Sequence, residues 1–378
     1  MFGHISLDII LLIMLYATCT AIAACACLYL LLRKGNAFDP TISTPPRLRR
    51  WAAIFFGLLA LGHLWYLPSA IFNTEEDIIL WTLIGALLDS VTIFPTAIIV
   101  QLCMLQDKRR PLWPVFLMIA PIFIIIVICI ILRSYALKTV FHAYMLLLGV
   151  GLVIYLVRAV KQYGRWLRNN YADLEDKEVW QSFVVFAAIL LVFGIYATGE
   201  GGIIYEFVVQ VLGTMMTCFI LWRVETLSDL SLSETLTANE TEDSMSTETS
   251  TSKEKATDAD DIIGTLLQQH CIDTRLYLQH DLTVAQLARA ISINRLYLSN
   301  YFSRQATTYN AYINMLRIKH FLKLYNEAIA EKRSFTALQL AKESGFRSYS
   351  TFSLAFKQRT GQSVTAWMQE LQERQQEQ

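Results

Sequence analysis

The sequence predicts an all-α protein in three parts. These are a seven-helix transmembrane bundle at residues 1–225, a disordered acidic linker at 226–261, and a cytoplasmic tandem helix-turn-helix domain at 262–378. Three observations lead to this prediction. Hydrophobic residues make up 54% of the chain, against roughly 45–50% in soluble proteins, and the excess lies before residue 225. Residues 226–261 are rich in Ser, Thr, Glu and Asp. After residue 262, one helical pattern occurs twice at a nearly constant spacing.

Seven apolar stretches precede residue 225, at 6–32, 51–72, 77–104, 112–132, 137–160, 179–198 and 202–222. A helix needs about 20 apolar residues to cross the hydrocarbon layer of a bilayer, and each stretch is that long. The first stretch is too long for the apolar region of a signal peptide, and no typical cleavage site closes it. We therefore expect seven spans that remain in the protein, with a lipid bilayer as partner.

Basic residues collect in every second connection between these stretches. They are Arg33, Lys34, Arg47, Arg49 and Arg50 in the first connection, Lys108, Arg109 and Arg110 in the third, and Lys161, Arg165 and Arg168 in the fifth. The alternate connections carry Glu75, Glu76 and Asp77, then Arg133 and Lys138, then Glu200. Because cytoplasmic loops are enriched in Lys and Arg, the pattern places the N-terminus outside and the C-terminus in the cytoplasm.

A few ionisable residues interrupt the apolar stretches. They are His63, Asp89, His142 and Glu206, with Glu200 at the outer edge of the last span. Because burying such a group in a bilayer is costly, each is a candidate for signal sensing. The alternative is that these residues pair with one another or reach toward the membrane surface. No folded extracellular domain is present between the spans, so a signal would be an unknown ligand inside the bundle, a membrane partner protein, or a property of the membrane.

Several classes of site are not supported by the sequence. The seven cysteines include no C-x-x-C pair, and the His, Asp and Glu residues lack the close spacing of metal ligands, so we expect no metal. The last stretch, 202–222, has no lysine for a Schiff base, which excludes a retinal-type receptor. No catalytic residues and no cofactor are predicted, and we expect the protein not to be an enzyme.

The predicted linker is strongly acidic. Residues 226–261 contain two lysines and ten carboxylates, a balance of 2 − 10 = −8. This composition cannot bury a core, so we expect a disordered tether with a reach of roughly 30–35 Å. Its charge suggests that it could occupy a basic domain and inhibit it, whereas the alternative is a solvated spacer.

The repeat after residue 262 has the layout of two helix-turn-helix motifs. The first copy begins at Thr283, turns at Ser292 and continues to Phe302, and the second begins at Thr336, turns at Gly345 and continues to Phe356. The offset is 336 − 283 = 53 at the start and 356 − 302 = 54 at the end, so the second turn has one additional residue. Each copy opens with Thr-x-x-Gln, the spacing of a helix capping box. Residues 271–378 carry 14 basic and 8 acidic side chains, a balance of +6 that suits a domain meeting phosphates.

This part of the chain resembles the DNA-binding domain of AraC/XylS transcriptional regulators. The resemblance lies in residues 276–288 and 296–302, in Tyr312 to Ile318 of the middle helix, and in Gly345-Phe346, residues 350–357 and Thr360-Gly361. It covers about residues 262–370 and implies seven helices with two recognition helices that enter the major groove. Together with the seven apolar stretches, the resemblance indicates a membrane-anchored form of the family, located as a multi-pass protein in the bacterial inner (cytoplasmic) membrane. Two positions depart from the family pattern: Ala306-Thr307 replaces a glycine, and Val364 replaces a proline.

Each recognition helix has a predicted inner and outer face. Asn294 and Ser348 are the expected N-caps, and Leu298, Phe302, Phe352 and Phe356 point inward. Outward side chains expected to contact DNA are Arg295, Leu296, Ser299, Asn300, Ser303, Tyr349, Ser350, Ser353, Leu354 and Lys357, with Arg304, Arg347 and Arg359 as phosphate contacts. Arg295 suits guanine and Asn300 suits adenine. Arg317 is expected to hold the two halves together.

These observations predict a membrane-bound, sequence-specific transcription regulator that couples a membrane or extracytoplasmic signal to gene expression through double-stranded DNA. A homodimer would be favoured, because two tethered domains gain effective concentration at a repeated site. The alternative class is a transporter or membrane enzyme with a regulatory soluble tail. It predicts a polar path that joins His63, Asp89, His142 and Glu206. A third class is a receptor-like protein whose tail binds another protein.

Overall fold

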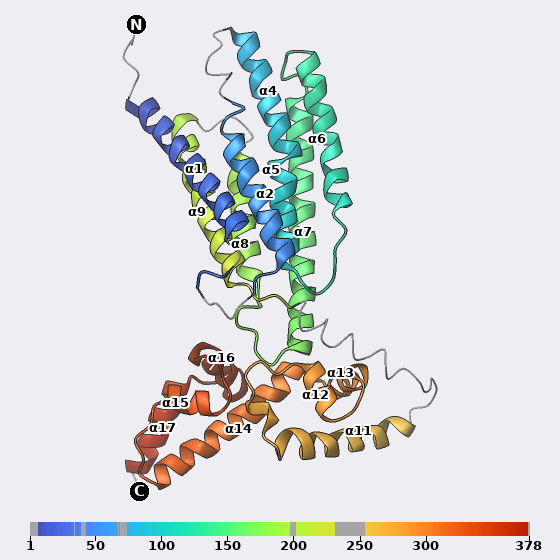
Figure 1. The fold of residues 1–378 in the computed structure, drawn as a ribbon, viewed down its shortest axis with the longest axis vertical. Coiled ribbons are helices and arrows are strands. Elements are labelled where there is room, and N and C mark those ends of the chain that lie inside the picture. Colours follow the sequence, from blue (N-terminus) through green and yellow to red (C-terminus); the bar gives the residue numbers. More distant parts are fainter. Residues whose placement is uncertain are drawn as a thin grey trace. The chain divides into compact units, whose positions relative to one another are not determined.

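The computed structural model describes residues 7–33, 35–38, 43–66, 68, 74–196, 202–230 and 254–376. Within these residues the fold is all-helical, and the only extended pairing is a single antiparallel bridge between Tyr171 and Thr283. The chain divides into two compact units (Figure 1). The first consists of Met1–Tyr163 and Val179–Glu234, and the second of Gly164–Glu178 and Thr235–Gln378.

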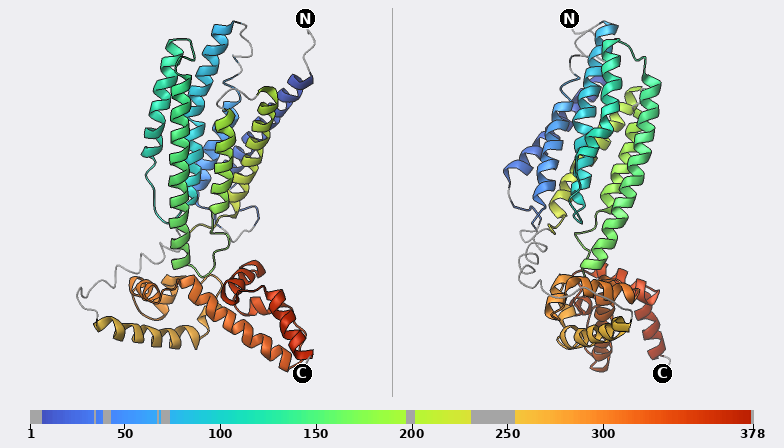
Figure 2. Two further views of the ribbon diagram at one scale, coloured as in Figure 1. Left: turned by 180° about the vertical axis from the view of Figure 1, so that it is seen from behind. Right: turned by 90° about the vertical axis from the view of Figure 1, so that its right-hand side faces the viewer.

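The first unit is a bundle of apolar helices. Its helices are α1 (Leu7–Leu32), α2 (Pro46–Gly62), α4 (Glu75–Val91), α5 (Ile93–Met104), α6 (Trp113–Ile131), α7 (Lys138–Asn170, whose last turns belong to the second unit), α8 (Trp180–Tyr196) and α9 (Gly202–Thr226). Helix α1 packs against α2 and α9, α2 against α5, α4 against α6, and α8 against α9, as Figure 2 shows from two sides.

Among the described residues of this unit, five regions are long and apolar enough to cross a membrane, judged by length and composition. They are Ile10–Leu32, Glu75–Met104, Trp113–Ile131, Lys138–Asn170 and Glu206–Thr226. The second and sixth predicted stretches form α2 and α8, each of 17 residues. Both fall below the roughly 20 residues that a bilayer crossing usually takes. The number of seven spans therefore stays a prediction.

The third predicted stretch is interrupted at Thr92, between α4 and α5. Thr92 leaves the helical conformation, with φ −120° and ψ −66°. The physical cause lies three residues later, because Pro95 has no backbone N–H to donate to the carbonyl of Val91 and its ring crowds that carbonyl. The proline therefore divides this predicted stretch into two helices.

The second unit contains the repeated motifs. Its α-helices are α11 (Glu254–Leu267), α12 (Val284–Ala290), α13 (Arg295–Arg304), α14 (Tyr309–Ala330), α15 (Ala337–Glu343), α16 (Tyr349–Thr360) and α17 (Val364–Gln376), with a π-helical turn at Gln268–Ile272 and a 3-10 turn at Leu276–Leu278. These are seven α-helices among residues 254–376, the number that the family resemblance implies. Helix α11 begins at Glu254, inside the predicted linker, whose residues 231–253 lie outside the described residues.

Two hydrophobic cores lie side by side along α14. The first half of the unit packs Leu287, Leu298 and Phe302 against Ile313 of α14. The second half packs Leu340, Phe352, Phe356 and Trp367 against Phe321 of the same helix. Because one continuous helix supplies side chains to both cores, it fixes the distance between the two helix-turn-helix motifs.

Candidate nucleic-acid interface

The first helix of each motif begins at a threonine cap, as the sequence predicts. Thr283 forms the complete capping box: its side chain accepts from the backbone N–H of Gln286, and the Gln286 side chain accepts from the backbone N–H of Thr283. Thr336 accepts from the backbone N–H of Gln339. The Gln339 side chain instead donates to Glu343 at 2.9 Å, so the second capping box is only half formed.

The two turns have the same hydrogen bonds. Ile293 donates its backbone N–H to Ala288, and Phe346 donates to Ala341, at 3.0 and 3.1 Å. A left-handed residue stands in each turn, Ser292 with φ 58° and Gly345 with φ 87°. The offset is still 53 at this point, since 346 − 293 = 53, whereas the caps Asn294 and Ser348 differ by 54. The additional residue of the second motif is therefore Arg347.

Helix α13 presents the face that its sequence predicts. Asn294 caps it by accepting from the backbone N–H of Leu296, and Leu298 and Phe302 are buried in the first core. Leu296 is 65% exposed. Ser299 and Arg295 are half-buried, and the remaining predicted side chains Asn300, Ser303 and Arg304 are exposed.

Helix α16 is built in the same way. Ser348 caps it by accepting from the backbone N–H of Thr351, and Phe352 and Phe356 are buried. Leu354 is 61% exposed, and the other predicted side chains Tyr349, Ser350, Lys357 and Arg359 are exposed, with Ser353 and Arg347 half-buried. An exposed leucine on each recognition helix offers an apolar contact for the methyl group of thymine.

One outward residue was not among the sequence-based candidates. Tyr297 is 59% exposed and lies on the outer side of α13. Helical spacing could have identified it, because Tyr297 precedes Asn300 by three residues and Arg304 by seven, on one face of the helix.

Arg317 of α14 joins the two halves, as predicted. Its guanidinium is 1% exposed and donates to three backbone carbonyls of the first half, Tyr277 at 2.8 Å, Gln279 at 2.7 Å and His280 at 3.2 Å. It also lies over the ring of Phe346 in the second half, 5.7 Å from the centroid. Burial lowers the pKa of Arg317, and the nearby negative charge of Asp173 opposes that shift.

Gly345 completes this junction. A Cβ at Gly345 would lie 2.7 Å from the Cα and 2.8 Å from the carbonyl oxygen of Leu278, which belongs to the first half. His280 Nδ1 lies 3.1 Å from the carbonyl oxygen of Gly345. The two halves therefore touch backbone to backbone, and their recognition helices are held at a fixed relative orientation.

Three of the predicted DNA contacts already have partners inside the second unit. Arg295 donates to Asn170 at 2.6 Å, Arg304 pairs with Asp260, and Arg347 lies 3.5 Å from Asp176. Asp260 lies in the middle of α11, within the acidic stretch that the sequence identifies as a candidate inhibitor. Its partnership holds the pKa of Asp260 below the usual value.

The candidate sensing residues of the first unit are partly brought together. His63 Nε2 lies 3.0 Å from Gln210 Oε1, and Tyr16 donates to Glu206 at 3.2 Å. The rings of Tyr16 and His63 meet edge to face, with centroids 5.3 Å apart. This network joins α1 and α9 to His63 at the C-terminal end of α2.

Asp89 of α4 lies beside this network. It accepts from Trp65 at 2.9 Å and from Tyr66 at 2.6 Å, two residues that closely follow His63. Gly85 makes room for the Tyr66 ring, since a Cβ there would lie 2.4 Å from it. His142 is on α7 against Phe141, and none of the described residues of the network belongs to α7. Glu200 lies outside the described residues.

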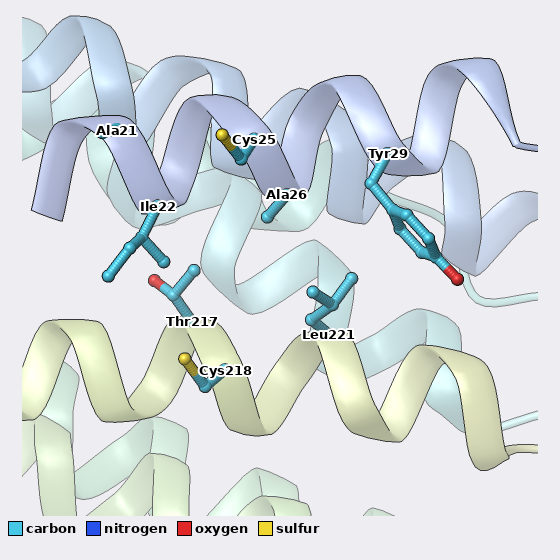
Figure 3. A pocket seen from close by; sticks show the side chains of 8 residues that line it. All are labelled: Ala21, Ile22, Cys25, Ala26, Tyr29, Thr217, Cys218 and Leu221. Atoms are coloured by element: carbon cyan, nitrogen blue, oxygen red, sulfur yellow. The ribbon is translucent and has the colours of Figure 1, made fainter. Parts of the chain in front are cut away.

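The first unit also has an apolar groove of about 380 Å³ between α1 and α9 (Figure 3). It is lined by Ala21, Ile22, Cys25, Ala26, Tyr29, Thr217, Cys218 and Leu221, so it offers no charged group to a polar ligand. In the described part of the chain, no group of three His, Cys, Asp or Glu side chains is placed to hold a metal ion.

Comparison with known proteins agrees with this geometry. Residues 287–370, from α12 to α17, match the family model of a helix-turn-helix domain. Neither the curated proteins nor the solved structures gave a match to the chain. The matched region contains both recognition helices and the Arg317 junction, and it supports the resemblance to AraC-type regulators. The C-terminal part of this chain is a helix-turn-helix domain of the kind found in DNA-binding transcription regulators.

Proposed function

We propose that this protein is a membrane-bound, sequence-specific transcription regulator whose C-terminal domain binds DNA from the inner face of a bacterial cytoplasmic membrane. The observation that carries the proposal is the pair of capped recognition helices held by α14 at a fixed separation. Two motifs in rigid connection can read two successive faces of the major groove without the cost of ordering them.

The proposed DNA contacts divide into two kinds. Arg295 and Asn300 at α13, with Ser299 and Ser303, would read base edges by hydrogen bonds, and Leu296 and Leu354 would contact thymine methyl groups. On α16, Tyr349, Ser350, Ser353 and Lys357 occupy the corresponding positions. Arg304, Arg347 and Arg359 would bind phosphates and set the register of the protein on the duplex.

The proposed role of the apolar helices is to detect the signal. The contacts of His63 with Gln210 and of Tyr16 with Glu206 tie α1, α2 and α9 together by polar groups in an apolar unit. Such groups are costly to leave unpaired in a bilayer, so a bound polar ligand that took over one of these contacts would favour a different packing of these helices. We include Asp89 in this site, whereas His142 and Glu200 stay candidates without a described link to it.

The transporter or membrane-enzyme alternative requires a polar path through the bundle. Three of its four predicted residues, His63, Asp89 and Glu206, do lie in or beside one network. The described members of the network satisfy one another, however, and Asp89 is occupied by Trp65 and Tyr66. This arrangement favours a compact polar sensing site and disfavours a polar path for transport.

The proposal is tested by selecting duplexes from a random-sequence pool with the full chain in lipid nanodiscs. We expect enrichment of one sequence class, with an affinity that falls steeply as salt is raised. Asn300→Ala should lower the affinity for the selected sequence by roughly tenfold, from about 1–3 kcal/mol of base discrimination, and leave non-specific binding nearly unchanged. Arg359→Ala should weaken both kinds of binding equally. Absence of any enriched sequence would contradict the proposal.

A further inference from the structure

We propose that the acidic loop between α7 and α8, residues 170–178, is an internal competitor of DNA that binds across both helix-turn-helix motifs. The inference rests on the proposed function and extends it to regulation. Residues Gly164–Glu178 belong to the same compact unit as the helix-turn-helix domain, although they lie more than 100 positions before α12 in the sequence.

The loop is anchored to the first motif by its backbone and by an apolar plug. The backbone N–H of Ala172 donates to Leu282 at 3.1 Å, next to the bridge between Tyr171 and Thr283. Asn310 of α14 donates to the carbonyl of Ala172 at 2.6 Å. The Ala172 side chain is 0% exposed and is part of the first hydrophobic core. The domain thus binds this segment of its own chain through backbone hydrogen bonds and a buried side chain.

From this anchor the loop reaches the start of each recognition helix. Asn170 accepts from Arg295, the first residue of α13, at 2.6 Å. Glu175 accepts from the hydroxyl of Thr351, in the first turn of α16, at 3.3 Å. Asp176 lies 3.5 Å from Arg347, the additional residue in the second turn. The loop therefore engages the N-terminal turns of α13 and α16 at once, where helix-turn-helix proteins contact base edges.

The loop is negatively charged, and this charge would make it compete with the phosphates of DNA. Residues 173–178 contain four carboxylates and one lysine, a balance of 1 − 4 = −3. Lys177 lies 3.5 Å from Asp281, whereas the carboxylates of Glu175 and Asp176 contact Thr351 and Arg347 of the second motif. A duplex at the same surface would bring its phosphates against these carboxylates, so loop and DNA cannot both bind there.

Asp173 is a buried acidic residue of the loop. It is 1% exposed, and burial raises the pKa of its carboxyl group. Its charge also opposes the lowering of the Arg317 pKa. Because the loop follows α7 and precedes α8, a change in the packing of these helices is a direct way to pull the loop from the domain.

The test compares DNA affinity among variants of the full chain in nanodiscs, with the selected duplex as the probe. The double variant Glu175→Gln, Asp176→Asn removes two carboxylates from the loop and keeps the size of each side chain. The hydrogen bond of Glu175 with Thr351 and the ion pair of Asp176 with Arg347 are partly exposed. Such contacts contribute about 0.3–1 kcal/mol each, so we expect the double variant to bind roughly 3-fold to 30-fold more tightly. The matched control is Glu331→Gln, Glu373→Gln, which removes the same charge from exposed positions just after α14 and on α17.

A charge effect alone would raise the affinity equally in the loop variant and in the control. The inference is overturned by that result, by unchanged affinity, or by weaker binding of the loop variant, which would mark the loop as a structural brace. A second readout is the hydrogen exchange of the Ala172 amide, which we expect to accelerate when the duplex is added. If no duplex is selected at all, the proposed function itself fails, whereas a selected duplex that leaves the exchange of the Ala172 amide unchanged overturns the loop inference alone.

Discussion

Replacing Gly345 by alanine tests whether the two motifs are locked together by direct backbone contact. Two costs arise from the structure. An alanine with φ near 87° is strained by roughly 1–2 kcal/mol. In addition, its Cβ would lie 2.7 Å from the Cα of Leu278, so the two backbones must separate by about 0.7 Å to restore ordinary contact. Overpacking of this kind costs typically 1–3 kcal/mol, which gives a total of about 2–5 kcal/mol.

Gly361 provides the matched control for this substitution. It has nearly the same backbone conformation, with φ 82°, but a Cβ there would meet nothing within 4 Å. Gly361→Ala should therefore cost only the conformational part, roughly 1–2 kcal/mol. The measurement is hydrogen exchange of the core amides of α14, such as Phe321, in the full chain. Equal losses of protection in the two variants would refute the contact argument, because only Gly345 touches the opposite half.

The same comparison bears on DNA binding. Separation of Leu278 from Gly345 changes the relative orientation of α13 and α16, and two linked binding elements lose affinity when they cannot engage simultaneously. Gly345→Ala should thus reduce binding to the selected duplex more than Gly361→Ala does, at a temperature where both variants are folded. Similar affinities of the two variants would mean that DNA binding tolerates a changed orientation of α16 relative to α13.

Further predictions concern other residues of the second unit. Ala306→Gly should stabilise it by about 1 kcal/mol in denaturant unfolding, since Ala306 has φ 50°. Arg317→Met should destabilise it by about 3 kcal/mol or more in the same assay, because three buried carbonyls lose their donor. Burial lowers the pKa of His320. The contribution of His320 to the free energy of unfolding should therefore be complete above its ordinary pKa of 6.5 and be lost as the pH falls through the lowered value. His320→Phe should remove this pH dependence of unfolding.

Local features of the second unit could be predicted from the sequence because they depend on neighbouring residues. The caps at Thr283, Asn294 and Ser348 and the burial of Phe302 and Phe356 follow from spacing along one helix. The repeat offset even located the additional residue of the second turn to within a few positions. The half-formed capping box at Thr336 is the exception, because Gln339 has a competing partner in Glu343, one turn further along.

Contacts between distant segments could not be predicted in this way. Nothing in the residues 170–178 indicates that Ala172 enters the core of a domain more than 100 positions later, because a small apolar residue in a polar loop has no distinctive pattern. The sequence did indicate an acidic competitor, but it pointed to 226–261. The structure places one residue of that stretch, Asp260, on Arg304, and places Asn170 and Asp176 on Arg295 and Arg347.

The two halves of the domain differ in how firmly the loop holds them. The first half is held by a buried side chain and backbone hydrogen bonds through Ala172, whereas the second is held by the partly exposed contacts of Glu175 and Asp176. Exposed polar pairs contribute less than about 1 kcal/mol each and weaken with salt, while the buried anchor does not. The second recognition helix can therefore be freed at a much smaller cost than the first. We therefore expect α16 to bind DNA first. Binding of DNA by α13 would then depend on release of the loop from the first half.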